Sequence, residues 1–416
     1  MAHLEIEDLT VLRGTRTIID NFSLKIEPGE CVIITGENGS GKTTLIEAVA
    51  GILPLNGGSI QVKRPFGLTL QSGGINGDEL VSERLDYASD VAGVECESEV
   101  LLHWDLEHRK SDRVGHLSGG LYRRLAVLQG LLPAYGQDER ICILDEPSEG
   151  LDDKSVEILR KDISCLRERG NSFLIATHDS RLIECATTLV DTSAVEKKND
   201  PLESTDDAPK LSIKTESTPI HKWSKKLDNR TLWPILSRCM PLVASILVLY
   251  ALLGDDVGAL VLVPTFLASL PPVSSLHHSK DSRSGDWWRA MGSRLLCLDP
   301  LSAMLIMISP MITATVLGAS YDAMTIGLVG LPFVAIYMAN GAIEELTVMM
   351  PRQNAQFLPL LSLILIWPLL IATDAIVSCS DRSLCSGDSL SLVVATIIPL
   401  IIWFSLPILH PRTGSH

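Results

Sequence analysis

The sequence is short of basic residues and lacks any leader-like segment. Lys and Arg number 35 against 50 Asp and Glu, which gives a formal net charge of −15. Because a nucleic-acid backbone is bound by clustered Lys and Arg, this balance argues against nucleic acid as a partner. Residues 1–5 contain neither a basic region nor the apolar core of a cleaved signal. We therefore expect the chain to begin in the cytoplasm.

The sequence also lacks cysteines spaced as metal ligands. None of the nine cysteines forms a C-x-x-C pair or stands with histidine at zinc-site spacing, which excludes a simple zinc motif. The cysteines of the first half lie in apolar contexts typical of small buried side chains in a reducing compartment; they are Cys31, Cys96, Cys142, Cys165 and Cys185. Cys379 and Cys385 lie in a segment expected outside the membrane, where a disulfide between them stays open.

The clearest motif is a glycine-rich stretch at residues 36–43, which fills every position of G-x-x-x-x-G-K-[ST]. The run before it (31–35) predicts a buried strand, and the run after it (45–50) predicts a helix. In that arrangement backbone N–H groups of the loop and the N-terminus of the helix bind the phosphates of a nucleotide. Lys42 is expected to reach the β- and γ-phosphates, and Thr43 to bind Mg²⁺. The predicted ligands of ATP are Gly36, Glu37, Asn38, Gly39, Ser40, Gly41, Lys42, Thr43 and Thr44.

Three further groups complete a phosphoryl-transfer site. Residues 141–144 predict a buried strand that ends in Asp145, expected to hold Mg²⁺ through its water shell, and Glu146, expected to polarise the attacking water. His178 follows the next predicted strand, where a neutral imidazole can hydrogen-bond both phosphate and water. Gln71 is expected to contact the γ-phosphate and Mg²⁺. The predicted catalytic groups are therefore Glu146, His178 and Gln71, with Thr43, Gln71 and Asp145 at the metal.

A second anion site is predicted at Ser118, Gly119 and Gly120, which begin a long helix. One chain already has a phosphate loop. The extra site therefore indicates a two-fold sandwich, a homodimer in which each Ser-Gly-Gly completes the partner's ATP site.

The order of these motifs over residues 4–195 resembles the ABC ATPase family. The resemblance implies an α/β P-loop ATPase domain (1–195) with an antiparallel β layer and a helical subdomain. It also implies a head-to-tail dimer that closes on ATP, with residues 148–152, and Asp152 among them, linking the two sites. The family usually stacks an aromatic residue on adenine. Arg13 occupies that place here, and its guanidinium can also stack on a base.

The second half differs in composition. Residues 1–220 carry 23 basic and 38 acidic residues, whereas residues 221–416 carry 12 of each. A polar linker with a basic segment (196–233) is followed by apolar runs near 234–253, 257–276, 301–318, 323–342, 356–377 and 390–409. These predict an all-α six-helix transmembrane domain over 234–410. Whether residues 221–233 lie on the membrane surface or merely flank the first run stays open.

Orientation follows from the basic residues of the short loops. The 277–299 loop carries four Lys and Arg, whereas 254–256 and 319–322 carry none. We therefore predict a multi-pass protein of the cell membrane with the ATP-binding domain and both termini cytoplasmic. Residues 286–289, Asp-Trp-Trp-Arg, predict a short helix resting on the ATPase near Gln71; the alternative is a tryptophan belt at the membrane interface.

Several short elements resemble the haem exporter family of cytochrome c maturation. They are the Arg13-Gly14 opening, Asp281 to Gly285, Asp299-Pro300 and the stretch 327–333. The resemblance implies an ATP-driven half-transporter for haem, with other cytochrome c maturation membrane proteins and a haem chaperone as partners. Two alternatives stay open: remodelling of a haem-chaperone complex without transport, and export of a lipid, drug or other amphiphile. Since no histidine falls in an apolar run, haem iron would need a ligand from a partner or from Met307 or Met311.

Overall fold

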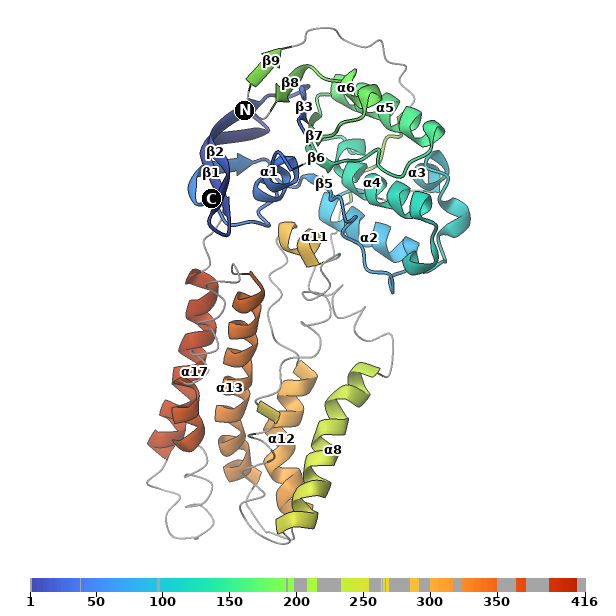
Figure 1. Ribbon diagram of the computed structural model, residues 1–416. Helices are drawn as coiled ribbons and strands as arrows, with labels where there is room; N and C mark the ends of the chain where they lie inside the picture. Colours follow the sequence, from blue (N-terminus) through green and yellow to red (C-terminus); the bar gives the residue numbers. More distant parts are fainter. Residues whose placement is uncertain are drawn as a thin grey trace. The chain divides into compact units, whose positions relative to one another are not determined.

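The chain divides into two compact units (Figure 1). The first holds Met1–Leu227, Asp281–Arg294 and Pro411–His416, and the second holds Asp228–Lys280 and Leu295–His410. Each unit has its own hydrophobic cluster. The computed structural model describes residues 2–37, 39–95, 98–191, 194–197, 208–214, 233–253, 263, 265, 267–268, 285–291, 300–316, 323–349, 364–371 and 389–409.

The first unit begins with an antiparallel β layer. Strands β1 (Leu4–Arg13), β2 (Arg16–Ile26) and β4 (Gly57–Val62) form a sheet in the order β2-β1-β4. Apolar side chains alternate with exposed ones along these strands, which buries one face and leaves the other polar. The predicted antiparallel layer is confirmed.

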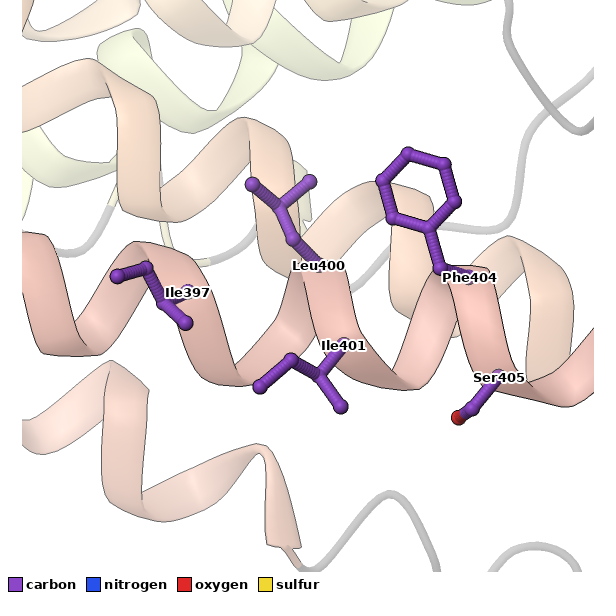
Figure 2. Close-up of a pocket in the computed structure, with 5 residues that line it drawn as sticks. All are labelled: Ile397, Leu400, Ile401, Phe404 and Ser405. Atoms are coloured by element: carbon purple, nitrogen blue, oxygen red, sulfur yellow. The ribbon is translucent and has the colours of Figure 1, made fainter.

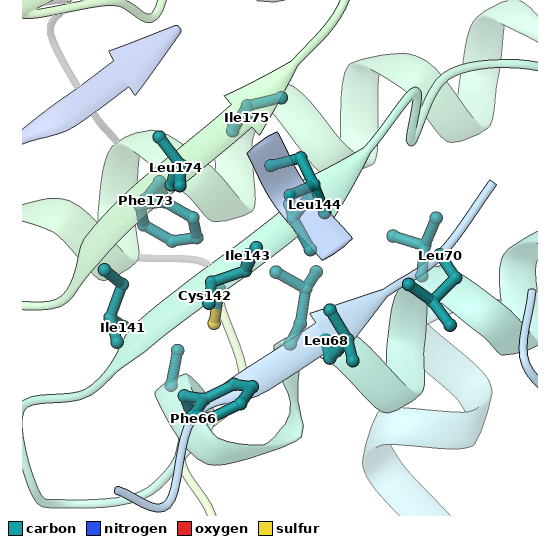
Figure 3. Close-up of a cluster of buried hydrophobic side chains, with 14 of the residues drawn as sticks. Phe66, Leu68, Leu70, Ile141, Cys142, Ile143, Leu144, Phe173, Leu174 and Ile175 are labelled. Atoms are coloured by element: carbon teal, nitrogen blue, oxygen red, sulfur yellow. The ribbon is translucent and has the colours of Figure 1, made fainter. Parts of the chain in front are cut away.

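A second sheet carries the motifs. Its order is β5-β6-β7-β3-β8-β9, parallel except for the last pair. Its strands read as continuous apolar runs because both faces are covered, and Figure 3 shows side chains of β5, β6 and β7 packed together. Burial raises the pKa of the Cys142 thiol to about 12. The strands are β3 (Cys31–Thr35), β5 (Gly67–Thr69), β6 (Ile141–Asp145), β7 (Ser172–Ala176), β8 (Thr188–Asp191) and β9 (Ala194–Lys197).

Helices surround this sheet and extend from it. The α2–α3 region, with two short 3₁₀ turns, forms the predicted helical subdomain beside α4. A buried network ties it to the core: Trp104 Nε1 donates to the Tyr135 hydroxyl (2.9 Å), which donates to Asp162 (2.5 Å). The elements are α1 (Lys42–Val49), α2 (Val81–Ala92), α3 (Ser98–His103), η1 (Glu107–Arg109), η2 (Val114–His116), α4 (Gly119–Tyr135), α5 (Asp153–Glu168) and α6 (Ser180–Ile183).

Part of the predicted linker packs on the first unit. Residues 208–214, here called the strap, bury Leu211, whose N–H donates to the Tyr135 carbonyl (2.8 Å). Arg169 donates to the Ala208 carbonyl (2.6 Å), and Lys214 pairs with the buried carboxylate of Asp90. The strap therefore touches the C-terminal ends of α2, α4 and α5.

The second unit is helical. It contains α8 (Trp233–Leu253), α12 (Pro300–Val316), α13 (Ala323–Met349) and α17 (Ser389–Leu409). Helix α13 packs against α12 and α17, and α8 contacts α12. Phe333, Ile336 and Tyr337 of α13 lie in the buried cluster. Figure 2 shows an apolar pocket on α17, lined by Ile397, Leu400, Ile401, Phe404 and Ser405.

The predicted six-helix transmembrane domain is not supported. Four of the six apolar runs coincide with α8, α12, α13 and α17, whereas 257–276 and 356–377 lie largely outside the described residues. Over the part of the chain that the structure describes, no helix combines the length and the apolar character needed to cross a membrane. Segment 221–232, Cys96, Cys379 and Cys385 also fall outside the described residues.

One close contact gives a stability prediction. A Cβ at Gly67 of β5 would lie 1.8 Å from the Gly130 carbonyl of α4 and 2.9 Å from Cys142 Sγ. We expect Gly67→Ala to cost about 1–3 kcal/mol or more, because backbone must move to admit a methyl group. The measurement is thermal unfolding of the full chain with hydrogen exchange at β5.

The matched control is Gly57→Ala, also in a strand, where the nearest atom to a new Cβ is 3.4 Å away. Its free energy of unfolding should change by about 0.5 kcal/mol or less. Equal destabilisation by the two variants would contradict the close approach of α4 to β5.

Candidate functional site

The phosphate loop connects β3 to α1, and its shape depends on glycine. Gly36, Gly39 and Gly41 have φ of 142°, 88° and 101°. At Gly41 a Cβ would also lie 2.9 Å from Ile18 Cγ2. Helix α1 begins at Lys42, directly after the loop, so its positive end faces the loop. This arrangement is an anion-binding cradle.

Lys42 folds back over the loop. Its Nζ donates to the carbonyls of Gly36 (2.7 Å) and Glu37 (3.1 Å), and the residue is 7% exposed. The ammonium therefore lies above the loop, where phosphate oxygens can replace these carbonyls as its acceptors. Thr44 is buried, and the buried Ser40 Oγ has no hydrogen-bond partner among the described residues. Asn38 lies outside them.

The carboxylate of Asp145 ends β6 beside the loop. Thr43 Oγ1 donates to its Oδ1 at 3.4 Å, while Oδ2 is buried without a hydrogen-bond partner among the described residues. Burial, reinforced by the nearby Glu146 carboxylate, raises the pKa of Asp145 to about 6 even though the Thr43 hydrogen bond lowers it. An orphaned buried oxygen next to a hydroxyl fits a divalent cation.

The Thr43 hydroxyl and the Asp145 carboxylate offer oxygen atoms, the type of ligand that Mg²⁺ takes. Within the described ranges, no three His, Cys, Asp or Glu side chains gather as a metal cage. Mg²⁺ is usually held by one or two carboxylates, water and substrate phosphates instead. Thr43 and Asp145 would hold the ion here.

Glu146 and His178 come together at the ends of β6 and β7. Glu146 has φ of 45°, and its N–H donates to the Ala176 carbonyl (2.8 Å). His178 Nδ1 lies 3.1 Å from Glu146 Oε2. The Glu146 side chain is 10% exposed and that of His178 73%, so the histidine lies on the solvent side of the carboxylate.

Gln71 lies just beyond β5 and reaches toward the segment 148–152. Its Nε2 donates to Glu149 Oε2 at 3.3 Å. Asp152 caps α5 by accepting from the Ser155 N–H (3.3 Å), and both its oxygens accept from Arg124 Nη2 (3.1 Å each). The Ser155 hydrogen bond, more than the charge of Arg124, lowers the pKa of Asp152. Asp152 thus has a structural partner on α4.

Ser118 caps α4, because its Oγ accepts from the Leu121 N–H (3.4 Å). Ser118 and Gly119 are exposed, and a Cβ at Gly119 would meet no atom within 4 Å. The N-terminus of this helix therefore opens to solvent. Arg13, predicted at the adenine, pairs with Glu47 of α1 and is half-exposed; its stacking on a base stays a prediction.

A segment from the second half of the sequence packs into the first unit. Helix α11 (Gly285–Ala290) leaves Trp287 2% and Trp288 4% exposed. The Arg84 guanidinium lies 4.0 Å from the Trp287 ring centroid, a cation–π contact. Arg64 Nη1 donates to the Ala290 carbonyl (3.0 Å). The predicted short helix on the ATPase is confirmed.

Sequence reasoning missed Arg84. The residue is fully buried in α2, where it donates to Gln129 (2.7 Å), Glu79 (3.4 Å) and the Gly74 carbonyl (2.6 Å). The sequence signal for a buried arginine was its place between Val81 and Leu85, on the apolar face of a helix.

The fold and the site define a nucleotide-binding P-loop domain, and comparisons name its family. Residues 19–149 match the family model described as ABC transporter. The cytochrome c biogenesis ATP-binding export protein CcmA of Gluconobacter oxydans is 30% identical over 42% of this chain and 81% of its own length. The chain belongs to the ABC transporter family.

Two further relatives show how broad the match is. An uncharacterized ABC transporter ATP-binding protein of Methanocaldococcus jannaschii is 29% identical over 44% of this chain and 70% of its own length. The Nod factor export ATP-binding protein I of Paraburkholderia xenovorans is 30% identical over 42% of this chain and 63% of its own length. Homologues in this membrane-associated family are ATPases coupled to transport, and this chain is an ATP hydrolase of that type.

The packing of α11 yields a prediction at Gly74. Its φ is 68°, and a Cβ there would lie 2.8 Å from Trp287 Cβ. We expect Gly74→Ala to displace α11 and to increase acrylamide quenching of tryptophan fluorescence, because the two buried indoles become accessible.

Gly93→Ala is the matched control, since Gly93 has φ of 74° but open space around a new Cβ. Both variants carry similar backbone strain, of order 1 kcal/mol, so a difference in quenching reports the contact with α11. The same quenching in both would contradict this contact.

Proposed function

We propose that the chain is an ABC half-transporter in which ATP hydrolysis in the first unit drives rearrangement of the second. The observation that carries this proposal is α11. It comes from between the helices of the second unit in sequence, yet its two tryptophans are buried in the first unit, beside the loop that follows Gln71. A change in that loop on nucleotide binding would therefore pull directly on the chain of the second unit.

In the proposed reaction, Lys42 and the loop N–H groups bind the β- and γ-phosphates of ATP. Thr43 and Asp145 would hold Mg²⁺, which when bound would neutralise charge on the phosphate oxygens. Glu146 accepts a proton from water, and His178, 3.1 Å from it, orients the carboxylate and the phosphate. Gln71 contacts the γ-phosphate side. Phosphoryl transfer is mainly positioning and charge stabilisation, so these groups suffice.

We further propose a homodimer. The exposed N-terminus of α4 at Ser118–Gly120 supports it, because a capped helix start open to solvent can take the phosphates bound by a second copy. Asp152, held by Arg124 one turn farther along α4, would stand at the dimer seam.

The second unit is proposed to contact the lipid bilayer. Its helices expose large apolar side chains that a soluble surface rarely gathers; among them are Met240, Leu247, Leu390, Ile401 and Phe404. The pocket on α17 in Figure 2 is lined by two of these. The family's association with membranes points the same way.

Haem handling in cytochrome c maturation is the proposed substrate assignment, supported by the sequence resemblance and by the name of the Gluconobacter relative. Partners would be other cytochrome c maturation membrane proteins and a haem chaperone. Remodelling of the haem-chaperone complex without transport is the second candidate. Export of a lipid, drug or other amphiphile is the third, favoured by relatives that carry the name of Nod factor export.

Replacing the proposed base tests the hydrolytic site. We expect Glu146→Gln to lower ATP turnover by about 100-fold or more while ATP still binds, since the amide cannot accept the proton. ATP should then trap a dimer visible by size-exclusion chromatography. Glu99→Gln, the same change at an exposed residue of α3, should leave turnover unchanged. Normal turnover in Glu146→Gln would refute the assignment.

Vesicles separate the three functions. The full chain should float with liposomes of anionic and zwitterionic lipid, and loss of flotation would remove the bilayer from the proposal. Haem added outside should then accumulate inside with ATP if it is transported. ATPase stimulation by a haem-loaded chaperone without accumulation supports remodelling. Indifference to both haem and chaperone leaves export of another amphiphile.

A further inference from the structure

Side chains hold the main chain of residues 70–75, the loop that contains Gln71. Each carbonyl from Leu70 to Ile75 accepts a side-chain hydrogen bond, and three of the four donor residues belong to α4. The donors are Arg123 to Leu70 (2.9 Å) and Gln71 (3.2 Å), Tyr122 to Ser72 (2.8 Å) and Ile75 (3.5 Å), Gln129 to Gly73 (3.1 Å), and Arg84 to Gly74 (2.6 Å).

Arg123 is the one donor of this set that also reaches the catalytic strand. Its Nη2 donates to the carbonyls of Asp145 (2.7 Å) and Glu146, while Nη1 serves Leu70 and Gln71. The residue is 5% exposed. A planar guanidinium has donors on both arms and can join two backbone segments at once, which a lysine ammonium on a flexible stem cannot reproduce.

The segment that Arg123 holds is strained. Glu146 has φ of 45°, a region that costs a non-glycine residue of order 1–3 kcal/mol and persists only when its surroundings fix it. Its N–H is fixed by the Ala176 carbonyl and its C=O by Arg123. The direction of the Glu146 carboxylate follows from this conformation, because the side chain leaves the same Cα.

We propose that Arg123 is a positioning residue that couples the loop 70–75 to Glu146. Arg123 joins the main chain of Gln71 to that of Glu146. The position of the loop 70–75, which lies beside α11, therefore determines the position of the Glu146 carboxylate. The inference rests on the proposed role of Glu146 as the base. Because Arg123 lies in the first turns of α4, the helix that begins at Ser118–Gly120 carries the coupling residue as well.

The test compares turnover with ATP binding in the full chain. We expect Arg123→Lys to lower kcat by about 10- to 100-fold, since a displacement near 1 Å in a reacting group costs about that much. The Kd for ATP should stay within about threefold, because the four hydrogen bonds of Arg123 go to main chain outside the phosphate loop. Arg109→Lys, at an exposed arginine paired with Asp112, should change neither quantity.

A second variant guards against misfolding. Arg123→Met fills a similar volume without burying an unpaired charge, and it removes all four bonds. It should show the same split between kcat and Kd. If kcat is unchanged in both variants, or if ATP affinity falls in parallel with kcat, the residue has no positioning role.

Combining variants separates this inference from the role of Glu146. Single-turnover hydrolysis by Arg123→Lys/Glu146→Gln should be about as slow as by Glu146→Gln alone, because Arg123 acts through Glu146. Losses that multiply would overturn the coupling. Normal turnover in Glu146→Gln alone would instead overturn the role of Glu146 as the base. Slow turnover in Glu146→Gln together with normal turnover in Arg123→Lys would overturn only the positioning role of Arg123.

Discussion

Main-chain carbonyls outside strands and helices need other hydrogen-bond donors, and in the first unit this need is concentrated in the loop 70–75. Apart from the Gly73 N–H, which donates to the Leu70 carbonyl (2.8 Å), the donors to these carbonyls are side chains. Two of these side chains are buried arginines, which bring positive charge into the core. Arg84 balances its charge with Glu79 and two indoles. The loop therefore has one well-defined position only when α2, α4 and α11 are all in place.

Helix α4 connects most of the features that matter. Its start presents Ser118 and Gly119 to solvent, and its first turns carry Tyr122 and Arg123 toward the loop. Farther along, Gly130 approaches β5 so closely that Gly67 must lack a side chain. We expect a helix packed this closely to move as a rigid element, so that a change at its N-terminus would reach the catalytic strand without a flexible step between them.

Local patterns predicted the first unit well. Continuous apolar runs predicted β3, β6 and β7. The phosphate loop followed from its G-x-x-x-x-G-K-[ST] pattern, and Asp145 and Glu146 from their position at the end of a strand. The tryptophan pair was predicted because two indoles in a short polar loop need a groove to bury them. Local pattern could not predict which residues form hydrogen bonds with partners far away in the sequence. Nothing near Arg123 in sequence reveals that its partners are Leu70 and Glu146.

The second unit also shows what the sequence pattern could not predict. Apolar runs correctly marked α8, α12, α13 and α17, but the six predicted spans are not supported. In the part of the chain that the structure describes, no helix is long and apolar enough to cross a membrane. Composition also could not reveal the contacts of the strap, because Leu211 and Lys214 stand in a polar stretch and their partners Tyr135 and Asp90 lie far back in the chain.

The strap changes the mechanics of the connection between the units. Tension along the main chain from residue 214 onward is not carried first by the edge strand β9, which could be peeled off one hydrogen bond at a time. It arrives at Lys214, and loads together a buried ion pair, a buried leucine and the carbonyls held by Arg169. Bonds loaded in parallel resist far better than bonds loaded in sequence.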